Sequence, residues 1–431
     1  MPEGVALSSG AASFHERTRM KHVIIGTGIA GVQAAETLRK LDAHASITVI
    51  AGEAFPPYSR PMISMVLAGE ARADQLPIRP PDFYDKLNIT PMTGEWVESI
   101  DVDARVVRTR SGGDVAFDRL LIASGADPRP VKAEGSGLGN IGFLRTAAHA
   151  RSLVEALPGA RKALVLGGGL VGFKAAYGLM HRGLEVTMLI RSGHPLAMQV
   201  DSHAGGLILR KLIDNGLRVE VGAEATAFEG DASGRVRRAR LSDGSVMDCG
   251  LVVVGKGVRP ATSFVPRDRI EVDLGILVND HMETSAPGIY AAGDAAEHFD
   301  VARKERWVNA IWPVAAEQGR VAAMNMAGRR VASRGSLGRN VIRIFDMDVL
   351  TAGIVNPPRE AAEYEVLHRT DRRRGAYRKV VLRDGRLVGV VMVNGIEQGG
   401  VFLSLIEKQA PLAIPPERLL DASFHCGRLP H

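Results

Sequence analysis

Apolar and polar positions follow the same order in two separate parts of the chain. Apolar residues fill 23–25, an alanine-rich helical pattern covers 32–41, and a second strand pattern, with apolar residues at 47, 49 and 50, covers 46–50. The same succession returns between 162 and 190. An apolar strand, a turn, a helix and a further strand form a βαβ unit, whose two strands lie parallel in one sheet. The pattern therefore predicts two βαβ units.

Three further apolar runs predict buried strands that end in turns of small residues. They cover 117–126, 251–260 and 288–295, and a helical pattern follows the last of them over 314–326. Small residues at a strand end let the backbone pass close to a ligand. These strands are therefore expected to complete the two parallel sheets at the edge where a cofactor would bind.

The last part of the chain has a different pattern. Residues 341–354 and 378–393 are strand-like, with a hairpin turn predicted at 383–386 and a helix over 400–408. No turn of the Gly-x-Gly-x-x-Gly kind connects a strand to a helix in this part. This part is predicted to be an α+β domain without a cofactor motif.

Glycine-rich turns connect the first strand of each predicted unit to its helix. Their glycines are Gly26, Gly28 and Gly31 in the first unit, and Gly167, Gly169 and Gly172 in the second. In such a turn the first glycine permits the tight bend, the second lets the backbone approach a pyrophosphate, and the third lets the helix pack on the strand. The helix N-terminus then faces the phosphates. Two such turns predict that the chain binds two dinucleotides, with hydride transfer between them as the simplest use.

Composition narrows the class of protein. The chain has 431 residues, enough for about three domains. Hydrophobic residues make up 45% and charged residues 24%, and no apolar run is long enough to span a membrane. Residues 1–19 are small and polar, without the apolar core of a secretory signal. They are expected to be a disordered leader, or to follow an upstream start ahead of a natural one at Met20. We expect a cytoplasmic protein.

The cysteine count excludes several kinds of site. Only Cys249 and Cys426 are present, far apart in the sequence. A disulfide scaffold, a local Cys-x-x-Cys redox pair and a self-contained iron–sulfur cluster all need more, or closer, cysteines. No metal site is predicted.

Basic residues give the chain a formal net charge of +6 and gather at Arg369, Arg372, Arg373, Arg374, Arg378 and Lys379. One interpretation is a solvated loop and strand edge. The other is a docking face for an acidic electron-transfer protein. Nucleic-acid binding has no support, because no recognised motif accompanies the charge.

The motifs, in this order, resemble the FAD- and NAD(P)-dependent pyridine nucleotide-disulfide oxidoreductase superfamily over nearly all of the chain after residue 20. The resemblance implies an α/β fold with two Rossmann-like domains, the NAD domain inserted in the FAD domain, and a C-terminal α+β domain. The implied division is a leader at 1–19, an FAD-binding domain at 20–140 and 266–335, an NAD(P)-binding domain at 141–265, and the last domain at 336–431.

The resemblance also implies which residues hold each cofactor. FAD would be held by Gly26, Gly28, Gly31, Glu53, Arg60, Ser124, Gly125, Gly293 and Asp294. NAD(P) would be held by Gly167, Gly169 and Gly172. Within the FAD set, Glu53 would bind the adenosine ribose (or be an exposed loop acid), Arg60 would lie along the flavin, and Asp294 would bond the ribityl chain. Trp307 and Trp312, near the Asp294 segment, either wall the flavin site or pack in an ordinary way.

The Ser59-Arg60-Pro61 loop and the C-terminal pattern resemble one branch of the superfamily, that of rubredoxin and nitrite reductases, which lacks redox cysteines. Within it, the chain resembles FAD subunits of anaerobic 2-oxoacid dehydrogenase complexes of the phenylglyoxylate type. The implied reaction is hydride exchange between nicotinamide C4 and flavin N5, with single electrons passed to iron–sulfur subunits or to a small redox protein. A stand-alone rubredoxin or ferredoxin reductase is the alternative. An NADH oxidase is disfavoured, because its redox cysteine is missing from 58–65.

Two positions depart from that branch. Met65 stands where relatives have a lysine, and Lys174 stands where many have a glutamate. We expect Lys174 to act catalytically by placing a positive charge near the flavin; the alternative is that it extends to solvent.

The end of the second βαβ unit lacks the acid that selects NAD, since Ile190 and Arg191 occupy it. Arg191 is therefore a candidate for binding a 2′-phosphate, or caps the strand end. NAD is favoured from the resemblance, and NADP is not excluded.

Overall fold

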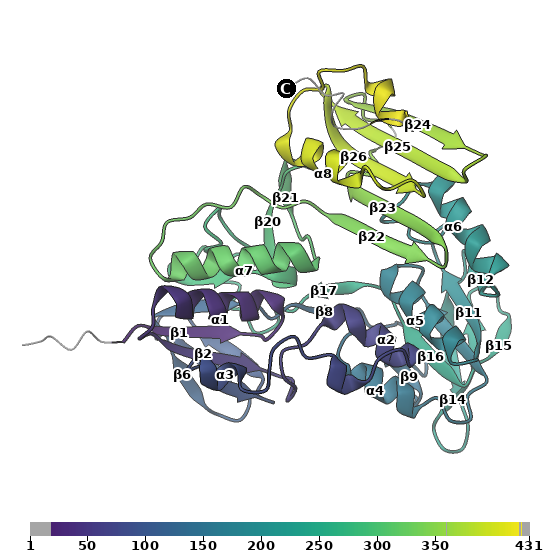
Figure 1. The fold of residues 1–431 in the computed structure, drawn as a ribbon. Coiled ribbons are helices and arrows are strands. Elements are labelled where there is room, and N and C mark those ends of the chain that lie inside the picture. The colour runs from purple at the N-terminus through teal and green to yellow at the C-terminus, as the bar shows by residue number, and fades with distance from the viewer. Residues whose placement is uncertain (1–18, 359, 422–423, 425–431) are drawn as a thin grey trace, which may run out of the picture.

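The computed structural model of the chain describes residues 19–358, 360–421 and Phe424. The predicted leader, apart from its last residue, lies outside the described residues, as does Cys426. Figure 1 shows two α/β units side by side, with a third, mainly antiparallel unit above them.

A parallel sheet in the order β19-β7-β1-β2-β3 forms the core of the first unit. Its strands are β1 (Lys21–Ile25), β2 (Ser46–Ala51), β3 (Thr90–Thr93), β7 (Arg119–Ile122) and β19 (Ile289–Ala291). Helices α1 (Ile29–Leu41) and α7 (Trp312–Met326) lie side by side on it (Figure 1). A Cβ on Gly319 would lie 2.2 Å from the carbonyl oxygen of Ala30, so glycine is what allows these helices to touch.

A second parallel sheet, in the order β12-β11-β10-β16-β9, forms the core of the second unit. Its strands are β9 (Ile141–Phe143), β10 (Lys162–Leu166), β11 (Glu185–Ile190), β12 (Arg218–Val221) and β16 (Leu251–Val254). Its helices are α4 (Ala147–Glu155), α5 (Leu170–His181) and α6 (Ser202–Asp214). Because β19 of the first sheet comes later in the sequence than all of these elements, the second unit is inserted in the first.

The two connections between the units run beside each other. Strand β8 (Ala126–Pro128) leads out of the first unit and pairs antiparallel with β17 (Val258–Pro260), which leads back. This confirms the predicted fold class of two Rossmann-like units, one interrupting the other. The exact domain limits given above stay a prediction.

The last unit is an antiparallel sheet in the order β22-β23-β26-β25-β24. Its elements are β22 (Arg339–Ile344), β23 (Met347–Gly353), β24 (Tyr364–Asp371), β25 (Ala376–Arg383), β26 (Arg386–Val393) and α8 (Gly399–Lys408). The predicted single segment at 341–354 is in fact a hairpin, which turns where Phe345 has a φ of 56°. Strand β24 escaped prediction because it is an edge strand with mostly exposed residues.

The other described elements surround these sheets. Two small antiparallel sheets are β4-β5-β6 (Val97–Asp101, Val106–Thr109, Asp114–Ala116) and β13-β14-β15 (Ala225–Gly230, Val236–Leu241, Val246–Asp248). A third group is β18-β20-β21 (Ile276–Leu277, Ala296–Asp300, Glu305–Trp307). Short helices are α2 (Ile63–Ala68), α3 (Phe83–Lys86), η1 (Arg60–Met62), η2 (Ala73–Gln75), η3 (Gly293–Ala295) and η4 (Pro416–Leu420).

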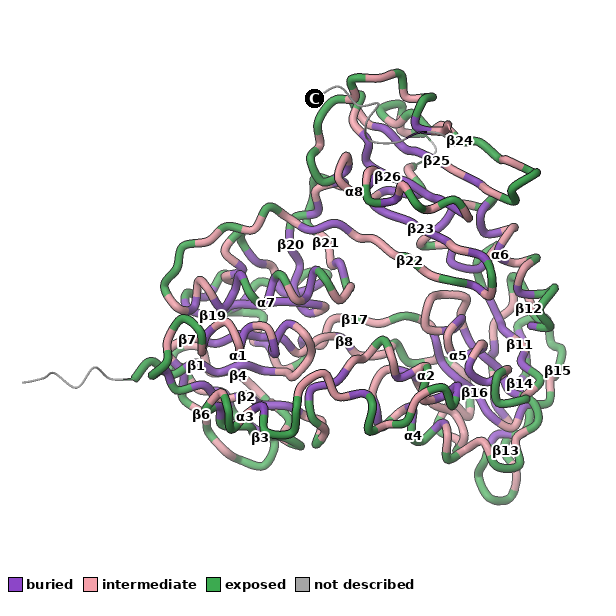
Figure 2. The backbone as a smooth tube through the Cα atoms, in the orientation of Figure 1, coloured by how far each residue is buried: buried purple, intermediate pink, exposed green. Residues whose placement is uncertain are grey.

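The last unit packs on the second one through buried residues of both, and Figure 2 marks the buried stretches of the backbone in each unit. One apolar cluster combines residues of α5, α6 and the second sheet with Ile344, Met347 and Val391 of the last. Within it Tyr377 Oη donates a hydrogen bond of 2.6 Å to Asp201, and Lys379 pairs with the same carboxylate at 3.2 Å. This contact fixes the position of the C-terminal sheet relative to α6.

The basic residues predicted as a patch therefore do not share one environment. Lys379 is buried in its ion pair with Asp201, and Arg378 donates hydrogen bonds to backbone carbonyls of Leu419 and Asp421. Arg369 pairs with Asp421. The solvated-edge interpretation is wrong for Lys379, because its ammonium holds two units together. Among the described helices, none is long and apolar enough to cross a membrane.

Candidate functional site

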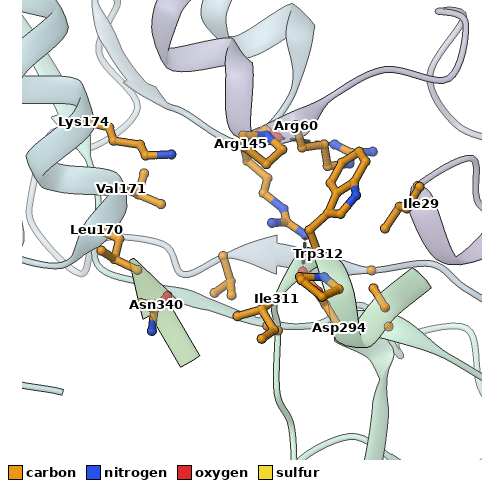
Figure 3. Close-up of a pocket in the computed structure, with 18 of the residues that line it drawn as sticks. Ile29, Arg60, Arg145, Leu170, Val171, Lys174, Asp294, Ile311, Trp312 and Asn340 are labelled. Carbon is orange, nitrogen blue, oxygen red and sulfur yellow. Dashed lines mark hydrogen bonds and ion pairs between the residues drawn. The ribbon is translucent and has the colours of Figure 1, made fainter. Parts of the chain in front are cut away.

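A cavity of about 630 Å³ opens where the three units meet. The first unit contributes Gly28, Arg60 and Asp294; the second contributes Leu170 and Lys174; the last contributes Asn340. Figure 3 shows side chains from different elements converging on one space, among them those of Arg60, Asp294, Leu170, Lys174 and Asn340. The cavity therefore joins the N-terminus of α1, which follows the first glycine turn, to the N-terminus of α5, which follows the second.

The first glycine turn has a separate steric reason for each glycine. Gly26 has a φ of 110°, and a Cβ there would lie 2.2 Å from the carbonyl oxygen of Ala123. A Cβ on Gly31 would lie 2.0 Å from the carbonyl oxygen of Gly26. At Gly28, in contrast, no atom of the described chain lies within 4 Å of the Cβ position. The space beside Gly28 is thus open on the side where a pyrophosphate would approach.

The second glycine turn repeats this geometry. Gly167 has a φ of 108°, and its Cβ would lie 2.5 Å from the carbonyl oxygen of Gly255. A Cβ on Gly172 would lie 1.9 Å from the carbonyl oxygen of Gly167. Around Gly169 the described residues again leave the Cβ position free to 4 Å. Both turns therefore have the shape that a dinucleotide pyrophosphate requires at a helix N-terminus.

The small-residue turns at the strand ends lie against the same cavity. Gly125 and Gly293 both line it and have φ values of 76°. Ser124 Oγ donates a 2.7 Å hydrogen bond to the carbonyl oxygen of Ala261, which joins the two connections between the units. Ser124 therefore has a structural partner, and its contact with a cofactor stays a prediction.

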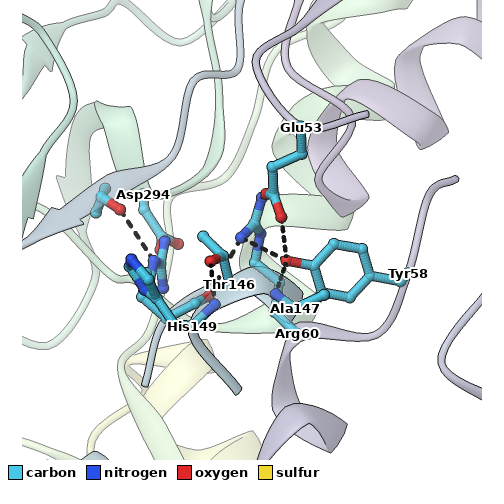
Figure 4. Close-up of polar contacts among 9 residues, drawn as sticks. Glu53, Tyr58, Arg60, Thr146, Ala147, His149 and Asp294 are labelled. Carbon is cyan, nitrogen blue, oxygen red and sulfur yellow. Dashed lines mark hydrogen bonds and ion pairs between the residues drawn. The ribbon is translucent and has the colours of Figure 1, made fainter. Parts of the chain in front are cut away.

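Asp294 is bound by an arginine that the sequence did not single out. Arg145 Nη2 lies 2.8 Å from Asp294 Oδ2, and its Nε donates to the carbonyl oxygen of Ala126 (Figure 4). Both side chains line the cavity. Arg145 lies just before α4 in an unremarkable stretch of sequence, so only the tertiary structure brings it to Asp294. The bond of Asp294 to a ribityl chain stays a prediction.

Glu53 belongs to a compact polar cluster. Its Oε1 lies 2.5 Å from Arg60 Nη2, and Tyr58 Oη donates a 2.8 Å hydrogen bond to its Oε2 (Figure 4). The backbone N–H of Ala147 donates to Tyr58 Oη at 3.0 Å, and burial raises the pKa of this phenol. Because its side chain is 18% exposed and bound by Arg60 and Tyr58, an exposed loop acid is the wrong description of Glu53. It is not among the described residues that line the cavity, and its contact with a ribose stays a prediction. In the structure its carboxylate binds Arg60, and Arg60 lines the cavity.

Replacing Glu53 by glutamine should destabilise the protein even without flavin. The partly buried Arg60 guanidinium would lose its charge partner, and we expect the free energy of unfolding to fall by about 1–2 kcal/mol. Urea denaturation of the flavin-free protein measures this. Asp74→Asn, which removes the exposed Arg72–Asp74 pair, is the control. Unchanged stability with weakened FAD binding would instead support the ribose assignment.

Lys174 lies on α5 with its ammonium directed into the cavity (Figure 3). Burial lowers the pKa of this side chain. Met65 lies on α2, with 37% of its surface exposed, and is not among the described residues that line the cavity. Lys174 thus points into the cavity shared by the units, and its action on a flavin stays a prediction.

Arg191 is exposed and comes directly after the last residue of β11. Ile190 before it is buried and packs on that turn, since a Cβ on Gly168 would lie 2.9 Å from its Cδ1. Nearby, Lys256 Nζ pairs with Glu224 at 2.9 Å. The pKa of Glu224 is lowered by this lysine and, to a lesser degree, by Arg191. One acid, Glu224, and two cations, Arg191 and Lys256, thus lie near one another at this end of the second sheet.

Trp312 lines the cavity at the start of α7. In Figure 3 its indole lies next to Arg60 and Arg145. Trp307 instead packs under the guanidinium of Arg303, 4.1 Å from the ring centre. In the part of the chain that the structure describes, no group of acids, histidines and cysteines could hold a metal ion.

The family model of pyridine nucleotide-disulphide oxidoreductases matches residues 20–319, and that of the rubredoxin NAD⁺ reductase C-terminal domain matches residues 339–410. The chain therefore belongs to the pyridine nucleotide-disulphide oxidoreductase family and is an oxidoreductase of that family. This confirms the resemblance inferred from the motifs. The family implies binding of FAD and NAD(P), and the two open glycine turns fit two such dinucleotides.

Among the known proteins that the chain resembles, some are much longer than the chain and others have about the same length. The chain is 30% identical over 405 residues to the assimilatory nitrate reductase electron transfer subunit of Bacillus subtilis, covering 94% of the chain but 51% of that protein. It thus spans about half the length of this relative. It is 30% identical over 412 residues to the NADH-dependent phenylglyoxylate dehydrogenase subunit epsilon of Aromatoleum evansii, covering 95% and 96% of the two chains. The chain is also similar to the solved covalent putidaredoxin reductase–putidaredoxin complex, with a TM-score of 0.84 and 25% identity. The match covers 93% of this chain and 96% of that one.

Proposed function

We propose that this protein moves a hydride between nicotinamide C4 of NAD(H) and N5 of bound FAD, and exchanges single electrons with an iron–sulfur partner. The observation that carries the proposal is the shared cavity, lined by Gly28 and Asp294 from one nucleotide unit and by Leu170 and Lys174 from the other. Two dinucleotides in these turns would direct their reactive rings into one enclosed space. Bound FAD would supply the conversion between a two-electron hydride and single electrons.

The protein's own residues would position the rings and shape their electrostatics. Arg60, held by Glu53, and Arg145, held by Asp294, form a rigid polar wall on one side. Leu170 and Val171 form an apolar wall on the other. Side chains fixed by such contacts hold a bound ring with little loss of conformational freedom, which favours the alignment that hydride transfer needs.

We further propose that the chain serves as the NAD-linked FAD subunit of a 2-oxoacid dehydrogenase complex of the phenylglyoxylate type. The support is a relative of that kind matched over almost its whole length. A stand-alone rubredoxin or ferredoxin reductase is the second candidate, favoured by the C-terminal domain match and by the similarity to a reductase solved with its redox partner. An NADH oxidase is less favoured, because 58–65 contains no cysteine.

Anaerobic assays of the purified protein test the proposal. With NADH it should reduce an oxidised rubredoxin or [2Fe–2S] ferredoxin, and it should not oxidise phenylglyoxylate alone. Co-purification from the native source separates the two candidates: a complex predicts large iron–sulfur subunits, and a reductase predicts one small redox protein. Rapid oxygen consumption without carrier reduction would contradict both.

NAD(H) is the nucleotide that we propose, with limited selectivity, because Arg191 stands where an acid would exclude a 2′-phosphate. Replacing Arg191 by alanine should lower kcat/KM for NADPH about tenfold, the value of one exposed charge-assisted hydrogen bond. The value for NADH should change less than about twofold. Steady-state kinetics with both nucleotides measures this, with the exposed Arg210→Ala on α6 as control. Equal losses for both nucleotides would show that Arg191 does not contact the 2′-phosphate.

A further inference from the structure

Charged side chains that line the cavity are almost all neutralised by a neighbour. The pairs are Arg60 with Glu53, Arg145 with Asp294, and Arg339 with Glu407. Lys174 is the exception: within residues 19–358 and 360–421, no ion pair or hydrogen bond is found for its ammonium. The cavity thus contains one cation that the described chain does not compensate.

The position of Lys174 on α5 explains where this charge points. Leu170, Val171 and Lys174 line the cavity and lie on one face of the helix, because residues three and four apart share a face. Three neighbouring residues of the same helix, Phe173, Ala175 and Ala176, are instead buried in the apolar cluster that includes residues of the second sheet. Lys174 therefore faces across the cavity toward the wall formed by Arg145 and Asp294 (Figure 3).

A half-buried ammonium without a counter-ion is unfavourable, and a ligand that brings negative charge would relieve it. Two anionic groups could enter this space under the proposed function. One is the pyrophosphate of the nicotinamide nucleotide, and the other is the flavin ring, which gains a net negative charge when it accepts a hydride. The pyrophosphate already has the N-terminus of α5 at Gly169, one turn away from Lys174.

We propose that Lys174 stabilises the negative charge of the reduced flavin ring, from the nicotinamide-binding side of the cavity. This inference rests on the proposed function, because it requires the flavin ring in the cavity. In the balanced step, NADH loses a hydride and becomes NAD⁺, while the flavin gains two electrons and one hydrogen and becomes an anion. Lys174 would favour this product and so raise the potential of the bound flavin.

Lys174→Met removes the charge at nearly the same length and is the main test. The equilibrium constant for reduction of the bound flavin should fall about tenfold, which for a two-electron couple corresponds to about 30 mV. Anaerobic titration against a reference dye measures the potential. The Kd of sulfite, which adds to oxidised flavin and leaves negative charge on the ring, should rise about tenfold as well. Neither measurement depends on turnover.

Three further variants keep the test decisive. Lys174→Gln provides a second neutral side chain should the methionine variant fold poorly, and Lys174→Arg should restore both values. Lys162→Met, at the exposed start of β10, is the matched control. Unchanged potential and sulfite affinity together with a raised KM for NADH would overturn the proposal in favour of a pyrophosphate contact. A wild-type protein that takes up no FAD would overturn the proposed function and this inference together.

Discussion

Replacing Gly28 by valine is expected to give a folded protein that purifies without FAD. Gly28 has an ordinary φ of −65°, and no described atom lies within 4 Å of its Cβ position, so valine meets no steric conflict inside the protein. Its methyl groups would instead fill the space at the N-terminus of α1 where the pyrophosphate binds. We expect FAD affinity to fall by more than about 100-fold, the loss of several hydrogen bonds to a charged group.

Flavin absorbance of the purified protein and its titration with FAD measure this loss. Circular dichroism and thermal unfolding of the flavin-free forms show whether folding is intact. Gly137→Val is the control, because this exposed loop glycine is likewise free of described neighbours within 4 Å of its Cβ position. Normal flavin content in the Gly28 variant would mean that the first turn does not hold the pyrophosphate.

Replacing Gly169 by valine should separate the two cofactors. This glycine caps α5 with a φ of −81°, and a side chain there would project into the open space of the second turn. The variant should therefore keep its FAD, which the first turn binds. Its kcat/KM for NADH should fall by more than about 100-fold, because the nucleotide's pyrophosphate can no longer reach the helix N-terminus.

Dithionite provides the check that flavin chemistry is intact. It should bleach the Gly169 variant as completely as the wild type, whereas NADH should bleach it very slowly. Loss of FAD from this variant, or unimpaired reduction by NADH, would contradict the assignment of the second turn to the nicotinamide nucleotide. Together the Gly28 and Gly169 variants assign each turn to its own dinucleotide.

The glycine turns could be predicted because their constraints are local. The close packing of the helix on the turn arises from a few consecutive residues, since a Cβ on Gly31 would meet the carbonyl oxygen of Gly26. The alternation of apolar strands and helical patterns likewise predicted the two parallel sheets. The placement of Lys174 in the cavity followed from its short distance to Gly172 on one helix.

Contacts between distant segments could not be predicted in this way. Arg145 meets Asp294 across 149 positions of sequence, and the segment before α4 has no pattern that marks it. The assignment of Glu53 to a ribose, from its place after β2, stays a prediction. What the sequence did not show is that the rigid loop after Glu53 folds Tyr58 and Arg60 back onto its carboxylate. Lys379 was placed among solvated arginines, although β25 carries it into the contact with Asp201.

If one cavity brings a flavin ring against a nicotinamide ring, NADH must reduce the bound flavin without any other protein. Anaerobic addition of NADH to the purified, FAD-loaded wild-type protein measures this. We expect an equimolar amount of NADH to bleach the flavin's visible absorbance, and an oxidised iron–sulfur protein then to restore it. A bound flavin that dithionite bleaches but neither NADH nor NADPH does would show that the two rings do not meet in this cavity.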